Sequence, residues 1–482
     1  MNVSLLNHEW FVIALALVIL LLDLWLPAKA KPRLGHVAAL GIVLILVYSV
    51  FWVKAQPGQT LYAFGQMYAL DPLALFFKRF FLVATLVVLV MSVEFAGSLE
   101  SGVAEYYALV LFALAGMLFA ASANHFALLF VSLELITVTF YILTSFQRAR
   151  LTSLEAGVKY LVIGGLSTGF TVFGIALVYG ISRKLDFGGL ATASAQLTGN
   201  KLFLLGLLLV MVGLGFKIAA FPFQIWAPDV YQGAPSPTTA FLAVGSKAAG
   251  FALLLRVLFI AVPAVTLHWS KLLIMVSAVT ILYGNVCALP QRNLKRLFGY
   301  SSIAHAGYML LGVAALSATG QSAVLFYLTG YLFTVLGAFT VICLVMTQVE
   351  GEDITALGGL YQRAPLLAVT MTLAMVSLGG IPPLAGFFGK FLLFKAALAR
   401  GASEPAYYWL VLIAIFGVII SLYYYFGVIR AIFWGKEPQL TPIRASTPVT
   451  ISLYACALGM LLLGIFPNWL LNAASDAVKG LG

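Results

Sequence analysis

Residues 215–237 read GFKIAAFPFQIWAPDVYQGAPSP, an apolar run that carries Lys217 and is then interrupted by Pro222 and Pro228. Proline removes a backbone donor and clashes with the preceding turn, so a helix that enters this stretch should break. Non-helical backbone at membrane depth persists only where protein or a wet cavity covers it. The stretch therefore predicts a broken helix beside a buried lysine.

A second stretch of this kind lies in the C-terminal half. Residues 377–395 read SLGGIPPLAGFFGKFLLFK, with Pro382 and Pro383 ahead of Lys390. The two breaks fall in the seventh and twelfth apolar runs. Successive spans cross the membrane in opposite directions, so two broken helices five spans apart would have opposite orientations. Paired broken helices indicate an inverted-repeat transporter with its site near the midplane of the membrane. The alternative is two unrelated proline kinks.

Composition indicates that the bilayer is the solvent for most of this chain. The 482 residues are 62% hydrophobic and 9% charged, against about 25% charged in soluble domains. Runs this long must be helices, because lipid leaves backbone groups to be satisfied internally. We predict an all-α integral membrane protein with about 14 transmembrane helices, near 8–27, 35–54, 73–96, 103–122, 125–145, 157–181, 201–221, 237–261, 270–289, 298–317, 322–347, 366–399, 405–434 and 448–471. We interpret the first run as a retained span, because no basic region precedes it.

The net charge of +11 is typical of membrane topology here and not of nucleic-acid binding. Many basic residues lie in short loops on one side of the predicted helices, including Lys29, Lys31, Arg33, Arg292, Lys295 and Arg296. One loop on the other side, around Arg183 and Lys184, is also basic. The positive-inside rule places the richer side in the cytoplasm and both termini outside it.

Four ionisable residues lie too far from the ends of their predicted spans to reach water easily: Glu134, Lys217, Lys247 and Lys390. A charge at mid-bilayer costs roughly 2.5–3.5 kcal/mol on insertion scales, so such residues are usually functional. Two alternatives stay open. The lysines beside the breaks could bond freed carbonyls, and Glu134 could form a structural ion pair with one lysine.

Other candidates have competing interpretations. His305 could pass protons near neutral pH or be a hydrogen-bonded packing residue. Lys159 could join the same path or form a surface pair with Glu155, one turn earlier. We interpret Lys295 as a cytoplasmic anchor. Lys78, Arg79 and Arg256 lie near the ends of predicted spans, where long side chains reach the interface.

This set of residues is suited to protons. Burial lowers the pKa of a lysine and a nearby carboxylate raises it again, so a movable carboxylate would let a lysine hold or release a proton. Glu134 and Lys217 are the natural pair, and Lys247, His305 and Lys390 would continue the path. No phosphate-binding loop, dinucleotide fingerprint or zinc-type spacing competes, and Cys287, Cys343 and Cys456 are isolated from one another.

These motifs resemble the proton-translocating antiporter-like subunits of complex I and Mrp-type antiporters. The resemblance extends from about residue 70 to 435 and rests on the 215–237 stretch and on TTAFLAVGSKAAG (238–250), EAGVKYLVIGGLSTGF (155–170), QRNLKRLFGYSSIAHAGYMLLG (291–312) and GGIPPLAGFFGKF (379–391). Within the family the chain resembles the N-type. The M-type carries glutamate where Lys390 stands, and the L-type has a long C-terminal helix that is missing here.

The resemblance implies two inverted five-helix repeats, each containing a broken helix. The expected segments are an N-terminal three-helix segment (1–100), the first repeat (101–262), the second repeat (263–435) and a C-terminal span (436–482). The family's mid-span glutamate falls on Glu134, its broken-helix lysine on Lys217, its next lysine on Lys247 and its terminal broken-helix residue on Lys390. His305 would stand in the second repeat where the first has Glu134.

The resemblance also implies a function: a non-redox subunit of a proton-translocating NADH:quinone oxidoreductase in a bacterial inner membrane. The chain would bind no cofactor, while NADH, FMN, iron–sulfur clusters and quinone would belong to other subunits. Its partners would be the M-type subunit, the small K-, J- and A-type neighbours and the lipid bilayer, without nucleic acid. An Mrp-type antiporter, a membrane-bound hydrogenase and a structural scaffold are the alternatives.

Overall fold

The computed structural model describes all residues except 1, 57, 100, 350, 436–441 and 482. Its helices are α1 Asn7–Asp23, α2 Leu34–Phe51, α3 Pro72–Ala96, α4 Val103–Ala121, α5 Phe126–Thr144, α6 Leu151–Ser182, α7 Phe187–Gln196, α8 Lys201–Ile218, α9 Trp226–Gly233, α10 Ser236–Phe241, α11 Lys247–Arg256, α12 Pro263–His268, α13 Ser270–Ala288, α14 Leu294–Ala314, α15 Ala318–Gln348, α16 Leu360–Arg363, α17 Pro365–Gly379, α18 Ala385–Gly401, α19 Ala406–Trp434, α20 Thr447–Ile465 and α21 Pro467–Val478. Short 3₁₀ segments are η1 Val3–Leu6, η2 Ala28–Arg33 and η5 Ile354–Leu357, and π-helical turns are η3 Leu242–Ser246 and η4 Val257–Ala261.

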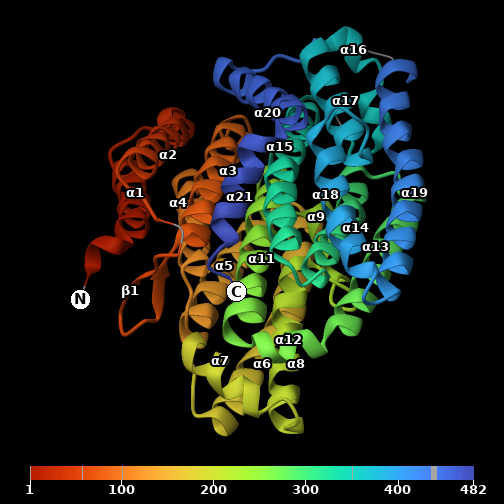
Figure 1. Ribbon diagram of the computed structural model, residues 1–482. Helices are drawn as coiled ribbons and strands as arrows, with labels where there is room; N and C mark the ends of the chain where they lie inside the picture. Colours follow the sequence, from red (N-terminus) through yellow and green to blue (C-terminus); the bar gives the residue numbers. More distant parts are fainter. Residues whose placement is uncertain (1, 57, 100, 350, 436–441, 482) are drawn as a thin grey trace.

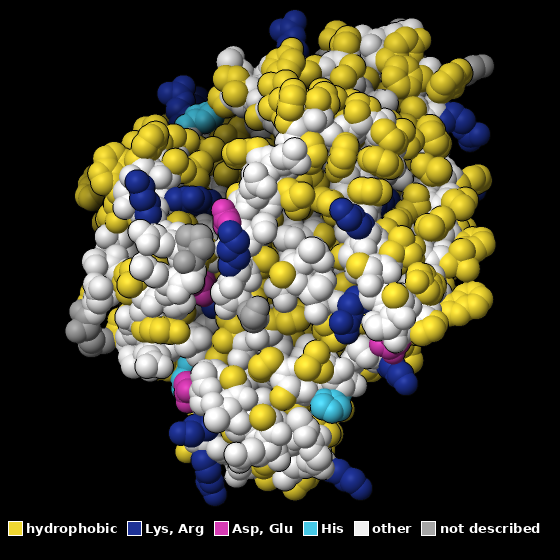
Figure 2. All heavy atoms as spheres, viewed as in Figure 1, with side chains coloured by type: hydrophobic (Ala, Val, Ile, Leu, Met, Phe, Trp, Pro, Cys, Tyr) yellow, Lys and Arg dark blue, Asp and Glu magenta, His cyan; other side chains and the backbone are white. Residues whose placement is uncertain are grey.

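The fold is that of a multi-pass helical membrane protein (Figure 1). Within the described residues, 13 helices are long and apolar enough to cross a membrane. The predicted run 366–399 is instead two shorter helices, α17 and α18. Hydrophobic side chains cover much of the molecular surface (Figure 2), because lipid and not water surrounds it. One antiparallel hairpin, β1 Leu61–Ala63 with β2 Tyr68–Leu70, departs from the all-α prediction.

The N-terminal helices form a layer on one flank of the molecule, at the left in Figure 1. α1 packs on α4, and α2 packs on α3. The C-terminal helices return to the same region, since α20 and α21 both pack on α15 and α21 also contacts α3. α15 therefore lies at the centre, and it is almost fully buried.

Both predicted helix breaks are confirmed. α8 ends at Ile218 with Ala219 in the left-handed region, and α9 begins at Trp226. α17 ends one residue before Gly380, which is also left-handed, and α18 begins at Ala385. Pro228 lies in the first turn of α9, where its missing N–H breaks no helical hydrogen bond.

Two further features recur in parallel in the two halves. His125, which caps α5, forms an isolated bridge with Asp186, and Asn293, which caps α14, forms one with Asp353. These parallels are consistent with the predicted repeats at 101–262 and 263–435. The four segment boundaries themselves stay a prediction.

The predicted positions of several basic residues are wrong. Lys78 and Arg256 do not extend to the interface: both are fully buried. Lys78 forms an ion pair with Glu9 of α1 at 2.6 Å, and Arg256 forms one with Asp71 at 2.8 Å. Tertiary packing closes water off from these helix ends, so each cation is neutralised inside the protein.

Two other basic residues also differ from the prediction. Arg79 is half-buried and donates to the carbonyl oxygens of Ser49 and Val53. Lys295 is no exposed anchor: it is buried, donates to the carbonyl oxygen of Ala234 and forms an ion pair with Glu352.

Candidate functional site

Glu134 and Lys217 meet at a small cavity between α5, α6 and α8. The cavity has a volume of about 20 Å³, which is room for one water molecule. Thr168 donates a hydrogen bond of 2.7 Å to Glu134, and Lys217 donates one of 3.0 Å to the hydroxyl of Thr137. Lys217 therefore does not form a direct ion pair with Glu134. The predicted pair shares a cavity in which one water could join the two charges.

The position of Lys217 depends on the helix break and on a close helix contact. The left-handed turn at Ala219 ends α8 directly after the lysine, at membrane depth. Gly250 of α11 faces it: a Cβ there would lie 2.7 Å from Ile218 and 3.3 Å from the side chain of Lys217. A glycine is needed at this contact because any side chain would push α11 away.

Lys247 connects the two halves of the molecule. It is 2% exposed and follows the π-helical turn η3, a distortion that often marks functional positions. Its ammonium donates to the carbonyl oxygen of Ser302 at 2.5 Å and also contacts the Ser302 hydroxyl. That hydroxyl lies 3.0 Å from the hydroxyl of Tyr231. Lys247 of the first half is thus bonded to α14 of the second half.

His305 lies in a chain of hydroxyl groups. Its Nδ1 is 2.5 Å from the hydroxyl of Tyr327, and its Nε2 is 2.9 Å from that of Tyr425. The same Tyr425 hydroxyl lies 2.5 Å from Ser301. Ser301 is the neighbour in sequence of Ser302, which bonds Lys247, so the polar groups near Lys247 and those near His305 lie on adjacent residues of α14.

Lys390 lies beside the second break. It donates to the carbonyl oxygen of Leu378 at 2.6 Å, and its ammonium stands 5.0 Å from the ring centre of Tyr308. The carbonyl belongs to the last turn of α17 and has no partner within that helix. Lys390 thus fits the alternative in which a lysine bonds a freed carbonyl. The ring of Tyr308 also packs against His305.

Lys159 lies apart from this buried set. It is 41% exposed and pairs with Glu155 and Asp229, each at 2.7 Å. Asp229 also binds Arg296. These four residues line an open cavity of about 220 Å³. The structure therefore favours the surface-pair interpretation of Lys159.

In the structure, His305 does not occupy the position in the second half that corresponds to Glu134 in the first half. Counted from the capping residue of each helix, Glu134 is the ninth residue after His125 and Ser302 is the ninth after Asn293. His305 is the twelfth residue, in the place of Thr137. The equivalent of Glu134 is thus the serine that binds Lys247, while His305 corresponds to the threonine that binds Lys217.

The pattern of charges in the sequence does not indicate the neutral partners of the lysines and of His305. They are Thr137, Thr168, Tyr231, Tyr327 and Tyr425. One signal was available in the sequence: a tyrosine hydroxyl inside a span needs a hydrogen-bond partner. Hydropathy alone cannot tell which partner a tyrosine finds.

A polytopic membrane protein with two broken helices, buried lysines, a buried histidine and a half-buried carboxylate among hydroxyls belongs to the class of ion- or proton-moving membrane subunits. The chain is a member of the NADH:quinone oxidoreductase/Mrp antiporter transmembrane family, whose model matches residues 123–421. It is 39% identical to NADH-quinone oxidoreductase subunit N of Trichlorobacter lovleyi, over 99% of this chain and 97% of that one.

Solved structures agree with this family. A chain of respiratory complex I from Thermus thermophilus matches with a TM-score of 0.79 and 36% identity, over 97% of this chain and 99% of that chain. A chain of the Mrp complex from Dietzia sp. DQ12-45-1b shares the fold, with a TM-score of 0.83 and 20% identity, over 100% of this chain and 98% of that chain.

Proposed function

We propose that this chain is the N-type subunit of a bacterial NADH:quinone oxidoreductase and that it moves protons across the membrane. One observation carries the proposal: Lys217, Lys247, Lys390 and His305 are buried in one helical bundle and bonded to hydroxyl or carbonyl groups, and half-buried Glu134 shares a water-sized cavity with Lys217. Buried ionisable residues in membrane helices mark proton relays. The 39% identity to a subunit N supports the choice within the family.

The proposed path begins at Glu134 and Lys217. A water in their shared cavity would let a proton pass between carboxylate and amine. Lys247 receives charge from this pair and hands it on through Ser302, Ser301 and the hydroxyl of Tyr425. His305 follows, and Lys390 beside the second break ends the path. Lys159 has no place in it, because it is an exposed residue of a surface cluster.

The chain itself carries no redox step in this proposal. NADH oxidation, FMN, iron–sulfur clusters and quinone reduction belong to other subunits, and the neighbours are the M-type subunit and the small K-, J- and A-type subunits. The enzyme activity is therefore that of the whole translocase. The membrane is the bacterial inner membrane, with both termini outside the cytoplasm according to the loop charges.

Two alternatives predict different outcomes. In an Mrp-type antiporter the same residues would exchange a cation for protons without NADH, but the Mrp chain is only 20% identical and shows the fold alone. In a structural scaffold the buried charges would only support assembly.

The test is Lys217→Ala in the assembled complex, with Lys271→Ala as the control because Lys271 is an exposed lysine outside the path. Assembly is checked by co-purification, and NADH-driven proton uptake is measured in inverted membrane vesicles. The proposal expects uptake to be lost in Lys217→Ala and retained in Lys271→Ala. Normal uptake by an assembled Lys217→Ala complex would overturn it.

A further inference from the structure

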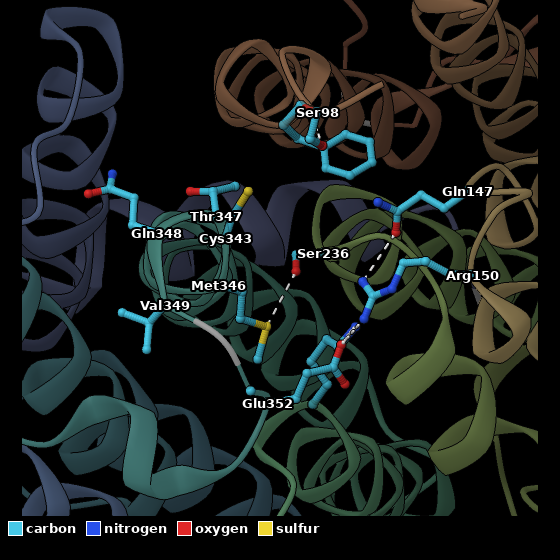
Figure 3. Close-up of a pocket in the computed structure, with 13 residues that line it drawn as sticks. Ser98, Gln147, Arg150, Ser236, Cys343, Met346, Thr347, Gln348, Val349 and Glu352 are labelled. Carbon is cyan, nitrogen blue, oxygen red and sulfur yellow. Dashed lines mark hydrogen bonds and ion pairs between the residues drawn. The ribbon is translucent and has the colours of Figure 1, made fainter. Parts of the chain in front are cut away.

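A second polar cavity lies away from the path described above, on the side of the molecule that carries the basic loops. It has a volume of about 480 Å³ and opens between the end of α3, the α5–α6 loop, the start of α10 and the end of α15. Figure 3 shows side chains of α15 on one side of it and Gln147 and Arg150 on the other. Water can fill a cavity of this size and polarity.

A carboxylate that binds three donors lies in the wall of this cavity. Glu352 accepts from Arg150 at 3.1 Å, from Asn293 at 3.1 Å and from Lys295 at 3.0 Å. Arg150 begins the α6 segment, whereas Asn293 and Lys295 belong to the start of α14. Glu352 therefore joins the two halves of the molecule at the mouth of the cavity.

Lys295 connects the cavity to the interior. It lines the cavity but is only 1% exposed, and it donates to the carbonyl oxygen of Ala234 at 3.1 Å. Ser302, which binds Lys247, is seven residues further along α14. Seven residues are two turns, or roughly 10.5 Å, and they return to the same face of the helix. The face of α14 that meets the cavity thus also meets Lys247.

The hydroxyl of Tyr231 lies close to the part of α14 that contacts Lys247. Tyr231 lies in the segment before Ala234, and its hydroxyl reaches Ser302. Hydrogen bonds and an ion pair thus join Glu352 to Lys295 at the cavity, and Tyr231 to Ser302 and Lys247 further inside, beside the same helix α14.

We propose that this cavity is the site at which the chain takes up protons for Lys247, with Glu352 as the proton acceptor and Lys295 as the residue that positions it. The inference rests on the proposed function. A hydronium ion in the cavity gives its proton to the carboxylate of Glu352 and becomes water. The protonated carboxyl then passes the proton to water beside Lys295, and its negative charge returns.

The donors around Glu352 keep its carboxylate charged. Burial raises the pKa of this carboxyl, but Lys295, Asn293 and Arg150 together hold it below its ordinary value of 4.5. Glu352 is therefore ionised at neutral pH. A structural clamp between α14 and the segment after α15 would need the same contacts, so the experiment must measure transport and not only stability.

The experiment blocks the cavity in the assembled complex. Thr347, an exposed residue of the cavity wall, is changed to cysteine in a background whose three native cysteines are replaced by serine. Thr447→Cys is the matched control, since this exposed threonine at the start of α20 does not line the cavity. Inverted vesicles are treated with a cationic, membrane-impermeant methanethiosulfonate, and NADH-driven proton uptake is measured before and after.

We expect the reagent to remove most of the uptake of Thr347→Cys and to leave that of Thr447→Cys unchanged. We also expect assembled Glu352→Gln to lose most of its uptake. Undiminished uptake by labelled Thr347→Cys would overturn the inference, whether or not Glu352→Gln assembles. Lys217→Ala, measured in parallel, separates the two proposals: if it abolishes uptake while the blocked cavity does not, only the uptake site is wrong.

Discussion

Lys217 donates its hydrogen bond to Thr137, at 3.0 Å, and not to Glu134, with which it shares a cavity. The cavity has a volume of about 20 Å³, which is room for one water between the two side chains. In the path proposed above, this water would carry the proton between the two groups.

The first prediction concerns that hydroxyl. Thr137→Val keeps the shape of the side chain but leaves the Lys217 ammonium without its acceptor. Since a hydrogen bond to a charged group contributes about 1.5–3 kcal/mol, we expect NADH-driven proton uptake to fall by roughly tenfold or more. Thr137→Ser retains the hydroxyl and should keep most of the uptake. Equal uptake by both variants would show that the hydroxyl has no role.

The second prediction concerns the link between Ser301 and His305. Tyr425→Phe removes the hydroxyl that contacts both residues while preserving the packing of the ring. We expect an assembled complex that oxidises NADH but has reduced proton uptake per NADH. Tyr454→Phe, an exposed tyrosine of α20, serves as the control. A Tyr425→Phe complex with the parental ratio would remove this hydroxyl from the path.

The third prediction concerns the buried pair of Glu9 and Lys78. Both side chains are enclosed, and the hydroxyl of Tyr68 contacts both. Removing one partner of a buried pair leaves an uncompensated charge and costs about 3–5 kcal/mol. We expect Lys78→Met to lower the melting temperature of the purified protein strongly, and the double variant Glu9→Gln/Lys78→Met to recover much of the loss.

The pair formed by Lys31 and Asp23 provides the control for that measurement. It is partly exposed, so Lys31→Met should cost only about 0–1 kcal/mol. Equal effects of Lys78→Met and Lys31→Met would contradict the role of burial.

The fourth prediction concerns the pH dependence of stability. The pKa of Glu352 is lower in the folded protein than its ordinary value of 4.5. Its ionised form therefore stabilises the fold above that value, and the stabilisation is lost as the pH falls through the folded pKa. We expect Glu352→Gln to lower the melting temperature at pH 7 and to have little effect in strong acid. A difference that stays constant across this range would refute the assignment.

The sequence determined the class of fold for a simple physical reason. A chain with so few charges must place its surface in lipid, and lipid forces helices, so composition and hydropathy suffice. The two helix breaks could also be predicted from the sequence, because proline disrupts the helix at its own position in the backbone. The prediction that Glu134, Lys217, Lys247 and Lys390 are functional rests on the cost of burying charge, which depends on depth along a span and hence on sequence position.

Tertiary structure alone decided which of these residues meet. Lys78, Arg256 and Lys295 lie near helix ends, and only packing against other segments shows that their charges are enclosed and paired. Hydroxyl partners such as Thr137 and Tyr425 are invisible to a search for charge, because their role arises from distance to residues far away along the chain. The position of a residue along its span sets its depth in the membrane and can be found in the sequence. The neighbours of its side chain depend on how the helices pack around it.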